Sequence, residues 1–250
     1  MAENKLFSLQ GPVYLSARDN AGRPVKPIWV GDATLEMAFD VTTVDHNESF
    51  SGQRLLYGRL TTQKNANLTL TLWEMLPDVL SLGLYSTLQT LTSGAVTAEA
   101  LPADLAADDL VKLDKAFVSN VVITDADSAP LTEGEHYVVE RADSGLVRIL
   151  DLASFVQPFS VAYDYAATRV APFFTATPPE RWLTLDGVNT LNNERVLVDL
   201  YRVQFSPTSQ FNLHNDEFGS FQLTGAAMAD ASKQADPNFG PFGRVTFKDE

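Results

Sequence analysis

The chain has 250 residues, of which 45% are apolar and 20% charged, and this composition is typical of a globular protein with a sizeable core. Its net charge of −14 argues against a surface that grips phosphates, because nucleic-acid affinity comes chiefly from Lys and Arg. The absence of cysteine excludes disulfides and thiolate metal sites. Neither a signal peptide nor a run of 18 apolar residues is visible, so we expect a chain made in a cytoplasm without membrane anchoring.

Strand patterns dominate the chain, as short segments of alternating or continuous apolar residues that end at Gly, Pro, Asn or Asp. The predicted strands are 13–17, 34–44, 67–73, 120–124, 136–140, 146–150, 159–165, 195–205, 220–226 and 244–247. Turns are predicted at 18–22, 143–145 and 186–187, where Gly follows short polar residues. The sequence therefore predicts a mainly β fold.

Two of these strands have one apolar face and one smooth polar face. Short polar, acidic or small residues occupy alternate positions, namely Thr34, Glu36, Ala38, Asp40, Thr42, Asn67, Thr69 and Thr71. Because successive side chains of a strand point to opposite faces, the intervening leucines and other apolar residues are expected to pack on the core. The other face then carries no aromatic ring and no long cation, which indicates a wet, slightly negative surface.

The segment 45–60 joins these two strands and is mostly polar. About sixteen residues is long for a hairpin connection, and such loops are usually functional or mobile. We therefore predict a long inter-strand loop that reaches outside its own domain as a contact element. Its candidate contact residues are His46, Asn47, Glu48, Ser49, Phe50, Gln53, Arg54, Leu55, Leu56 and Tyr57.

One flanking helix is predicted to begin near Pro77, because Leu76, Val79, Leu80 and Leu84 fall at helical spacing. The stretch 88–115 is rich in Ala, Thr and Asp and is expected to be a loop, with a weak helix at 103–110. Residues 116–166 are expected to form a compact meander, inserted peripherally into a single domain that spans 1–250.

No constellation of residues predicts catalysis, a metal site or a cofactor. His46, His136 and His214 stand in unrelated contexts without metal-ligand spacing. Residues 125–130 begin like a calcium loop but have Ala and Pro where a ligand and Gly are needed, so a turn is expected. Glu36 and Asp40 would lie about 13 Å apart on one strand, too far for a paired-carboxylate hydrolase. Carboxylates from neighbouring strands could close that gap, which leaves a hydrolase open as a third alternative.

Three tryptophans, Trp29, Trp73 and Trp182, would suit a sugar-binding platform if they flanked a groove. All three stand near strand ends beside apolar residues, where burial is the commoner outcome. We therefore expect them to be buried.

Several runs of sequence together resemble a known family of proteins. These are GDATLEM (31–37), VDHNESFSG (44–52), KNANLTLTL (64–72) before a short helix, LDGVN (185–189), VLVDLYRVQFSP (196–207) and NLHNDEFGSFQLTG (212–225). They resemble the tail tube, or major tail, proteins of long non-contractile bacteriophage (siphophage) tails. The likeness covers most of the chain and is weakest over 88–115.

This resemblance implies a β-sandwich or partial barrel that forms homohexameric rings, with the inner sheets closing into one ring barrel. Stacked rings would form the tail tube, a channel for genome DNA delivery, in a virion assembled in the bacterial host cytoplasm. The long loop would contact an adjacent ring. The implied channel-lining residues are Thr34, Glu36, Ala38, Asp40, Thr42, Asn67, Thr69, Thr71, Ser220, Gln222 and Thr224.

The resemblance also implies partners. Besides copies of itself, the chain would meet a tape-measure protein, tail-tip and terminator proteins, and double-stranded DNA in transit without tight binding. The main alternative is a β-sandwich receptor-binding or decoration protein of a virion, which would expose an aromatic patch and remain a small particle.

Overall fold

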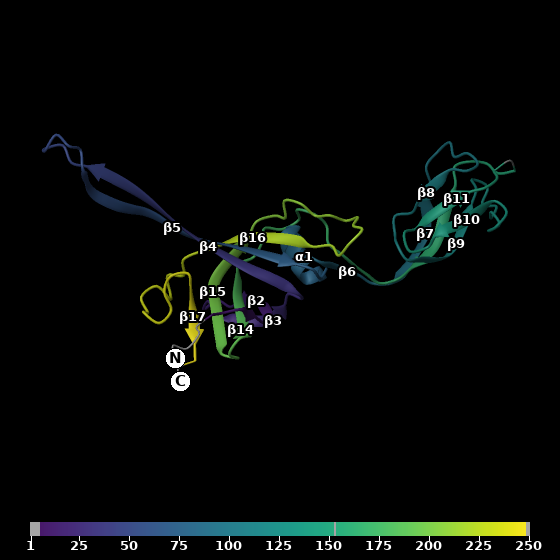
Figure 1. The fold of residues 1–250 in the computed structure, drawn as a ribbon. Helices are drawn as coiled ribbons and strands as arrows, with labels where there is room; N and C mark the ends of the chain where they lie inside the picture. Colours follow the sequence, from purple (N-terminus) through teal and green to yellow (C-terminus); the bar gives the residue numbers. More distant parts are fainter. Residues whose placement is uncertain (1–5, 153, 249–250) are drawn as a thin grey trace. The chain divides into compact units, whose positions relative to one another are not determined.

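The computed structural model describes residues 6–152 and 154–248, and the fold is mainly β, as the sequence predicts (Figure 1). The chain forms two compact units. Unit 1 combines Met1–Leu88 with Ala171–Glu250, and unit 2 is Gln89–Val170. The meander expected at 116–166 lies wholly inside unit 2, which begins well before it.

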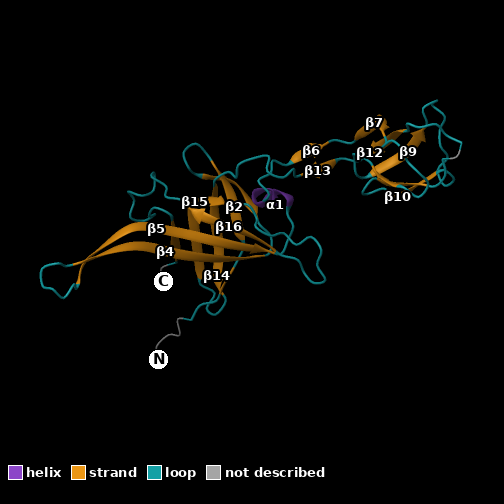
Figure 2. Ribbon diagram, turned by 90° about the horizontal axis from the view of Figure 1, so that it is seen from above, coloured by secondary structure: helices purple, strands orange, loops and turns teal. Residues whose placement is uncertain are grey.

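Unit 1 is built on one antiparallel sheet of nine strands. They are β1 (Leu9–Gln10), β2 (Val13–Arg18), β3 (Pro24–Trp29), β4 (Ala33–Asn47), β5 (Leu56–Leu72), β14 (Arg181–Asn189), β15 (Arg195–Phe205), β16 (Phe221–Ala227) and β17 (Gly243–Phe247). The strand order is β3-β2-β14-β15-β16-β5-β4, with β1 paired to β14 and β17 paired to β15. Figure 2 shows the long β4–β5 pair running across the direction of β14 and β15.

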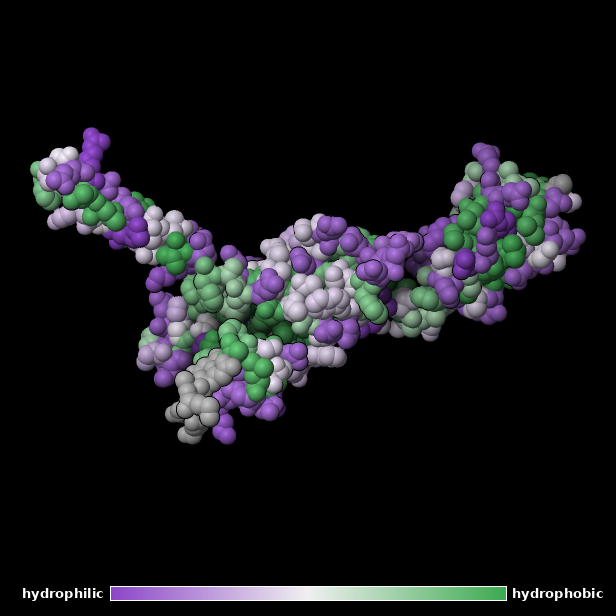
Figure 3. All heavy atoms as spheres, in the orientation of Figure 1, coloured by the Kyte–Doolittle hydropathy of each residue, from purple (hydrophilic) through white to green (hydrophobic). Residues whose placement is uncertain are grey.

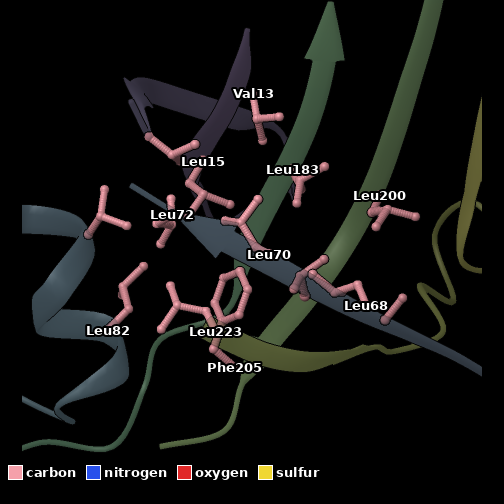
Figure 4. Close-up of a cluster of buried hydrophobic side chains, with 14 of the residues drawn as sticks. Val13, Leu15, Leu68, Leu70, Leu72, Leu82, Leu183, Leu200, Phe205 and Leu223 are labelled. Atoms are coloured by element: carbon pink, nitrogen blue, oxygen red, sulfur yellow. The ribbon is translucent and has the colours of Figure 1, made fainter. Parts of the chain in front are cut away.

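The sheet folds over on itself because β15 belongs to both of its halves. The first half of β15 pairs with β17, whereas its last three residues pair with β16. Leucines of β5 and β16 thereby face those of β2, β14 and β15 across a common core (Figure 4). The labelled core residues include Leu15, Leu68, Leu70, Leu72, Leu183, Leu200, Phe205 and Leu223. The described residues form a sandwich-like, open arrangement without a closed barrel.

The helix α1 (Pro77–Gly83) begins where the sequence predicts. Pro77 occupies the first turn, where a missing N–H costs nothing, and Asp78 adds a favourable negative charge there. Val79 and Leu82 are buried in the core of unit 1. In the part of the chain that the structure describes, no helix is long and apolar enough to cross a membrane.

Unit 2 has its own hydrophobic core between two small sheets. Its strands are β6 (Gln89–Leu91), β7 (Gly94–Ala100), β8 (Leu110–Lys112), β9 (Val118–Thr124), β10 (Tyr137–Arg141), β11 (Leu146–Ile149), β12 (Ser160–Tyr165) and β13 (Thr168–Val170). The sheets β7-β12-β9 and β10-β11-β8 enclose residues such as Ile123, Ile149 and Val161, which are fully buried. The pair β6–β13 joins the two ends of the unit, so unit 2 is a self-contained insertion.

Two segments expected to be loops contain strands over about half of their length. The expected loop at 88–115 contains β6, β7 and β8, and its expected helix at 103–110 forms turns instead. The expected loop at 45–60 is also wrong, because β4 continues to Asn47 and β5 begins at Leu56, which leaves only 48–55 as the connection. The strands β1, β3, β13 and β14 are also absent from the sequence prediction.

Candidate functional site

The strands β4, β5 and β16 present one continuous polar surface, which we call the polar face. Directly opposite residues of paired strands point to the same side of a sheet, so the pairing register defines its rows. The rows are Thr34, Thr71 and Gln222; Glu36, Thr69 and Thr224; Ala38, Asn67, Ala226 and Gln204; Asp40 and Asn65; Thr42 and Gln63. Every predicted lining residue within a strand therefore lies on one surface.

The remaining predicted lining residue, Ser220, is exposed and immediately precedes β16. The sequence reading missed Gln63, Asn65, Gln204 and Ala226, which extend the rows. Gln63 and Asn65 lie outside the predicted strand 67–73, whereas Gln204 and Ala226 lie inside the predicted strands 195–205 and 220–226, and alternation from Gln222 and Thr224 predicts Ala226. All members of the polar face are exposed or half-buried, and the amide of Gln222 donates to the Thr71 hydroxyl across the strands at 3.3 Å.

The charge of the polar face is small and negative. Glu36 and Asp40 are the only ionisable members of its rows. The acidic excess of the whole chain lies mostly elsewhere. Unit 2 has 13 Asp and Glu against 5 Lys and Arg, which gives a net charge of −8. The rest of the chain has 19 Asp and Glu against 13 Lys and Arg, which gives a net charge of −6. Two carboxylates per copy, not the total of −14, thus determine the electrostatics of this surface.

A groove of about 700 Å³ opens on the polar face beside β15. Its polar lining includes Asn67, Thr69, Gln204 and Thr224, and it contains no Asp, Glu, Lys, Arg or His. The hydroxyl of Tyr85 at its wall donates to the backbone oxygen of Phe205 at 3.1 Å. A groove with this lining can form neutral hydrogen bonds but supplies no pair of groups for acid–base chemistry.

Beyond the polar face, β4 and β5 continue as a two-stranded ribbon that we call the arm (residues 41–64). β16 pairs with β5 only from Ala66 to Leu72, so the arm strands pair with each other alone. Figure 1 shows this ribbon leaving the body of unit 1. An isolated hairpin is marginally stable in water, which makes a partner for the arm physically favourable.

Two bulges on β5 set the faces of the arm. Thr62 is the extra residue of the first bulge and Tyr57 that of the second. Because the first bulge adds no residue to β4, the alternation of β4 continues, and the apolar pair Val44–Leu60 falls on the same side as Thr42. The apolar residues of the arm therefore lie on both of its faces, and Figure 3 shows green and purple residues interspersed along it.

The arm is held in register by polar contacts. The Arg59 guanidinium donates to both oxygens of Asp45, at 2.6 and 2.8 Å, and holds the pKa of that carboxyl below its usual value. The hydroxyl of Thr62 donates to the backbone oxygen of Thr42 at 3.1 Å. These contacts favour one shape of the ribbon over its alternatives.

Glu48 organises the connection 48–55, which we call the tip. Its buried carboxylate accepts the hydroxyl of Ser51 and the backbone N–H groups of Phe50 and Ser51, both at 2.8 Å, and of Leu55 at 3.3 Å. Led by the Ser51 contacts, these bonds lower the pKa of Glu48 to about 2. The tip is thus a structured turn, and it presents Phe50 against the ring of Tyr57 at 5.7 Å.

We expect Glu48→Gln to loosen the tip. The amide keeps the shape of the side chain but loses the charge that strengthens its bonds, so the tip amides should exchange hydrogen roughly tenfold faster. Since the folded pKa is depressed, the anchoring in the native protein is complete above pH about 4.5 and is lost as the pH falls towards 2. Hydrogen-exchange mass spectrometry of a 48–57 peptide checks both statements, with Asp216→Asn as the exposed control; native-like exchange in Glu48→Gln would contradict them.

The remaining candidate groups do not converge on a second site. His46 lies in the arm, His136 in unit 2 accepts the Thr132 N–H, and His214 lies on an exposed segment of unit 1. Across residues 6–152 and 154–248 there is no cluster of three potential metal ligands. Asp125, at the start of the calcium-loop-like run, instead accepts backbone N–H groups of Asp127 and Ala129, as the predicted turn requires.

The expectation that all three tryptophans are buried is wrong for two of them. Trp182 is 5% exposed, and its indole N–H donates to Asp199 at 3.1 Å. Trp29 and Trp73 are 49% and 42% exposed. Trp29 is the last residue of β3, and Trp73 directly follows β5.

Comparison with known proteins adds one finding. No curated protein matches the chain. A family described as "Protein of unknown function UCP028589" matches residues 6–246, which span both units. The chain therefore belongs to this family.

Proposed function

We propose that this chain is a tail tube subunit of a siphophage-like virion, which self-assembles into stacked rings around a channel for DNA. The observation that carries the proposal is the register of β4, β5 and β16, which aligns the polar residues in rows on one exposed surface. Such a surface lining a channel offers no aromatic ring and no cation to a passing duplex. The resemblance of the sequence to tail tube proteins supports the same reading.

The open edge of β4 supports assembly with other copies. β4 ends the strand order, and among the described residues nothing pairs with its outer side over fifteen residues. A long unpaired edge is a liability that closure against a neighbouring copy removes. The arm would then reach an adjacent ring, because its partnerless ribbon and exposed apolar side chains mark an interaction surface.

DNA passes such a channel by electrostatic avoidance. Glu36 and Asp40, repeated in each copy, repel phosphates and leave few adhesive contacts. At about 0.15 M salt the Debye length is roughly 8 Å, so the repulsion acts only on close approach. It prevents sticking rather than driving transport.

Negative-stain microscopy of the concentrated protein tests the proposal against its alternatives. A tube subunit should form hollow tubes of constant diameter. A receptor-binding or decoration protein, for which the exposed Trp29 and Trp73 or the separate unit 2 would be suitable binding surfaces, should remain a small particle. Particles that stay monomeric or trimeric at every concentration would overturn the proposal.

We expect the double variant Glu36→Lys/Asp40→Lys to form tubes yet slow DNA ejection from particles that carry it. Cations on the polar face would bind phosphates and release counterions. Retention by only 1.4 kcal/mol corresponds to about tenfold in rate. Glu194→Lys/Asp216→Lys, which changes two exposed acids away from this surface, is the matched control. Unchanged ejection kinetics in the first variant would remove these two residues from the mechanism.

A further inference from the structure

Two exposed aromatic patches lie at opposite ends of the β4–β5 pair. The tip patch consists of Phe50 and Tyr57, 77% and 70% exposed, with Leu55 and Leu56 beside them. The base patch consists of Trp29, Trp73 and Met75. β5 separates the two with 17 residues, which at about 3.3 Å per residue is roughly 50 Å.

The base patch lies near the end of β3 and the end of β5, which hydrogen bonds through Asp32 join. Trp29 ends β3, and Trp73 follows the last residue of β5. The backbone N–H of Trp73 donates to the oxygen of Asp32 at 3.0 Å, and the Glu74 carboxylate accepts the Asp32 N–H at 3.3 Å. These bonds hold the backbone of Asp32 against Trp73 and Glu74, so two acidic residues adjoin the base patch.

The two patches complement each other in charge as well as in apolar character. The tip contains one cation, Arg54, which is exposed, and its one carboxylate, Glu48, is buried among N–H groups. The base patch has two carboxylates and exposed indole rings, both of which attract a guanidinium. Neither patch has this complementarity with itself.

We infer that the tip patch of one copy docks on the base patch of a copy in the next ring. This inference rests on the proposed function and names the acceptor of the arm. Because donor and acceptor are different surfaces of one subunit, the contact can repeat in one direction from ring to ring, as a filament requires. A symmetric dimer could satisfy it only with its two copies antiparallel, and cross-linking would then stop at the dimer.

The size of the contact explains why rings, not single subunits, should stack. If a whole aromatic side chain has about 200 Å² of surface, the four aromatic side chains of the two patches expose roughly 500 Å² together. This is below the ~1,200 Å² of stable interfaces, so one tip–base contact is weak. A ring engages several contacts at once, and their combined strength far exceeds that of each alone.

Chemical cross-linking tests the contact directly, because the chain has no cysteine. Ser49→Cys in the tip and Met75→Cys in the base patch are combined in one chain and treated with a short bis-maleimide. The ~50 Å between them excludes a link within one copy, so we expect a ladder of covalent multimers. Ser49→Cys with Phe218→Cys, a fully exposed position elsewhere in unit 1, is the control and should give none.

A charge exchange provides a second measurement that does not depend on cross-linking. Arg54→Asp should reduce tube formation and the ladder at least tenfold, and adding Asp32→Arg should restore both. Tubes that form without a Ser49–Met75 ladder, or a ladder only through residue 218, would overturn the inference and leave the proposed function standing. Absence of tubes at every concentration would overturn both.

Discussion

Replacing residues 43–62 with an Asn-Gly turn should abolish tube elongation and leave unit 1 folded. Thr42 and Gln63 are directly opposite each other, so a two-residue turn can close the shortened hairpin. Of the residues removed, only Glu48 is buried. The free energy of unfolding should therefore change by less than about 1 kcal/mol, which corresponds to a shift of about 2–4 °C in the melting temperature.

Electron microscopy and thermal unfolding together measure this result. A shorter truncation joins Asn47 directly to Leu56 and removes only the tip. These two residues are paired, so the ribbon below them stays intact. We expect this truncation to prevent elongation as well, because the tip is lost. Thr61→Ser, in the middle of the arm, is the matched control and should assemble like the native chain. Normal tubes from either truncation would show that the arm is not the stacking element.

The polar face could be predicted because burial leaves a strict pattern in the sequence. Leu68, Leu70 and Leu72 are almost completely buried on one side of β5, so the residues between them had to be polar. Because a slip of one residue would expose every leucine, the pattern determines which side of each strand is polar, whereas the exact register against β4 and β16 comes from the structure. The start of α1 was predicted separately, from Pro77 and the helical spacing of Val79 and Leu80.

The arm could not be predicted as a strand pair because neither of its faces is buried. Without a core side there is no alternation to detect, and the apolar positions change faces at Thr62. A polar, two-sided ribbon therefore has the composition of a loop. The expectation of a sixteen-residue loop is therefore wrong, since only 48–55 connect the strands, although the residues named as candidates for contact do lie in the arm and its tip.

Local departures from the usual strand patterns explain why β14 and some strands of unit 2 were not predicted. Asp186-Gly187 has the composition of a turn, yet Gly187 lies mid-strand, where a Cβ would come within 2.7 Å of the backbone oxygen of Val196. A glycine in a strand marks such a close approach as readily as a turn. In unit 2, β7 is rich in Ala, Thr and Gly and pairs on one side only, so its pattern is weak.

Loss of the Arg18 guanidinium should destabilise unit 1 more than any surface change. Arg18, 13% exposed and at the end of β2, donates to Glu180 at 2.7 Å and to Asp230 at 2.5 Å. Arg202 of β15 donates to the same Glu180. Charged hydrogen bonds thus join two strands to the segment that follows β16, where Asp230 is 7% exposed.

The carboxylates of this network are held in their charged form. The hydrogen bond from Arg202 lowers the pKa of Glu180 against the opposing effect of burial, and Arg18 adds to it. Burial acts to raise the pKa of Asp230, but hydrogen bonds from Ser232 and the charge of Arg18 outweigh it, so the pKa is lowered. Both shifts stabilise the fold above the ordinary carboxyl pKa of about 4, and this contribution is lost as the pH falls below it.

We expect Arg18→Met to cost about 3 kcal/mol, because it keeps the volume of the side chain but leaves a buried carboxylate without its cation. Arg23→Met is the matched control, since its guanidinium pairs with Asp19 while 73% exposed, and it should cost less than about 0.5 kcal/mol. All three tryptophans belong to unit 1, so their fluorescence during urea unfolding reports this unit alone.

A double-mutant cycle separates the ion pair from simple loss of packing. If the charges of Arg18 and Asp230 are coupled, Arg18→Met combined with Asp230→Asn should cost less than the two single changes together. The double variant should also lose stability less steeply in acid than the native chain, because one of the depressed carboxyl pKa values is gone. Additive costs with an unchanged acid slope would mean that the pair does not stabilise unit 1, and that Arg18 contributes by the packing of its side chain alone.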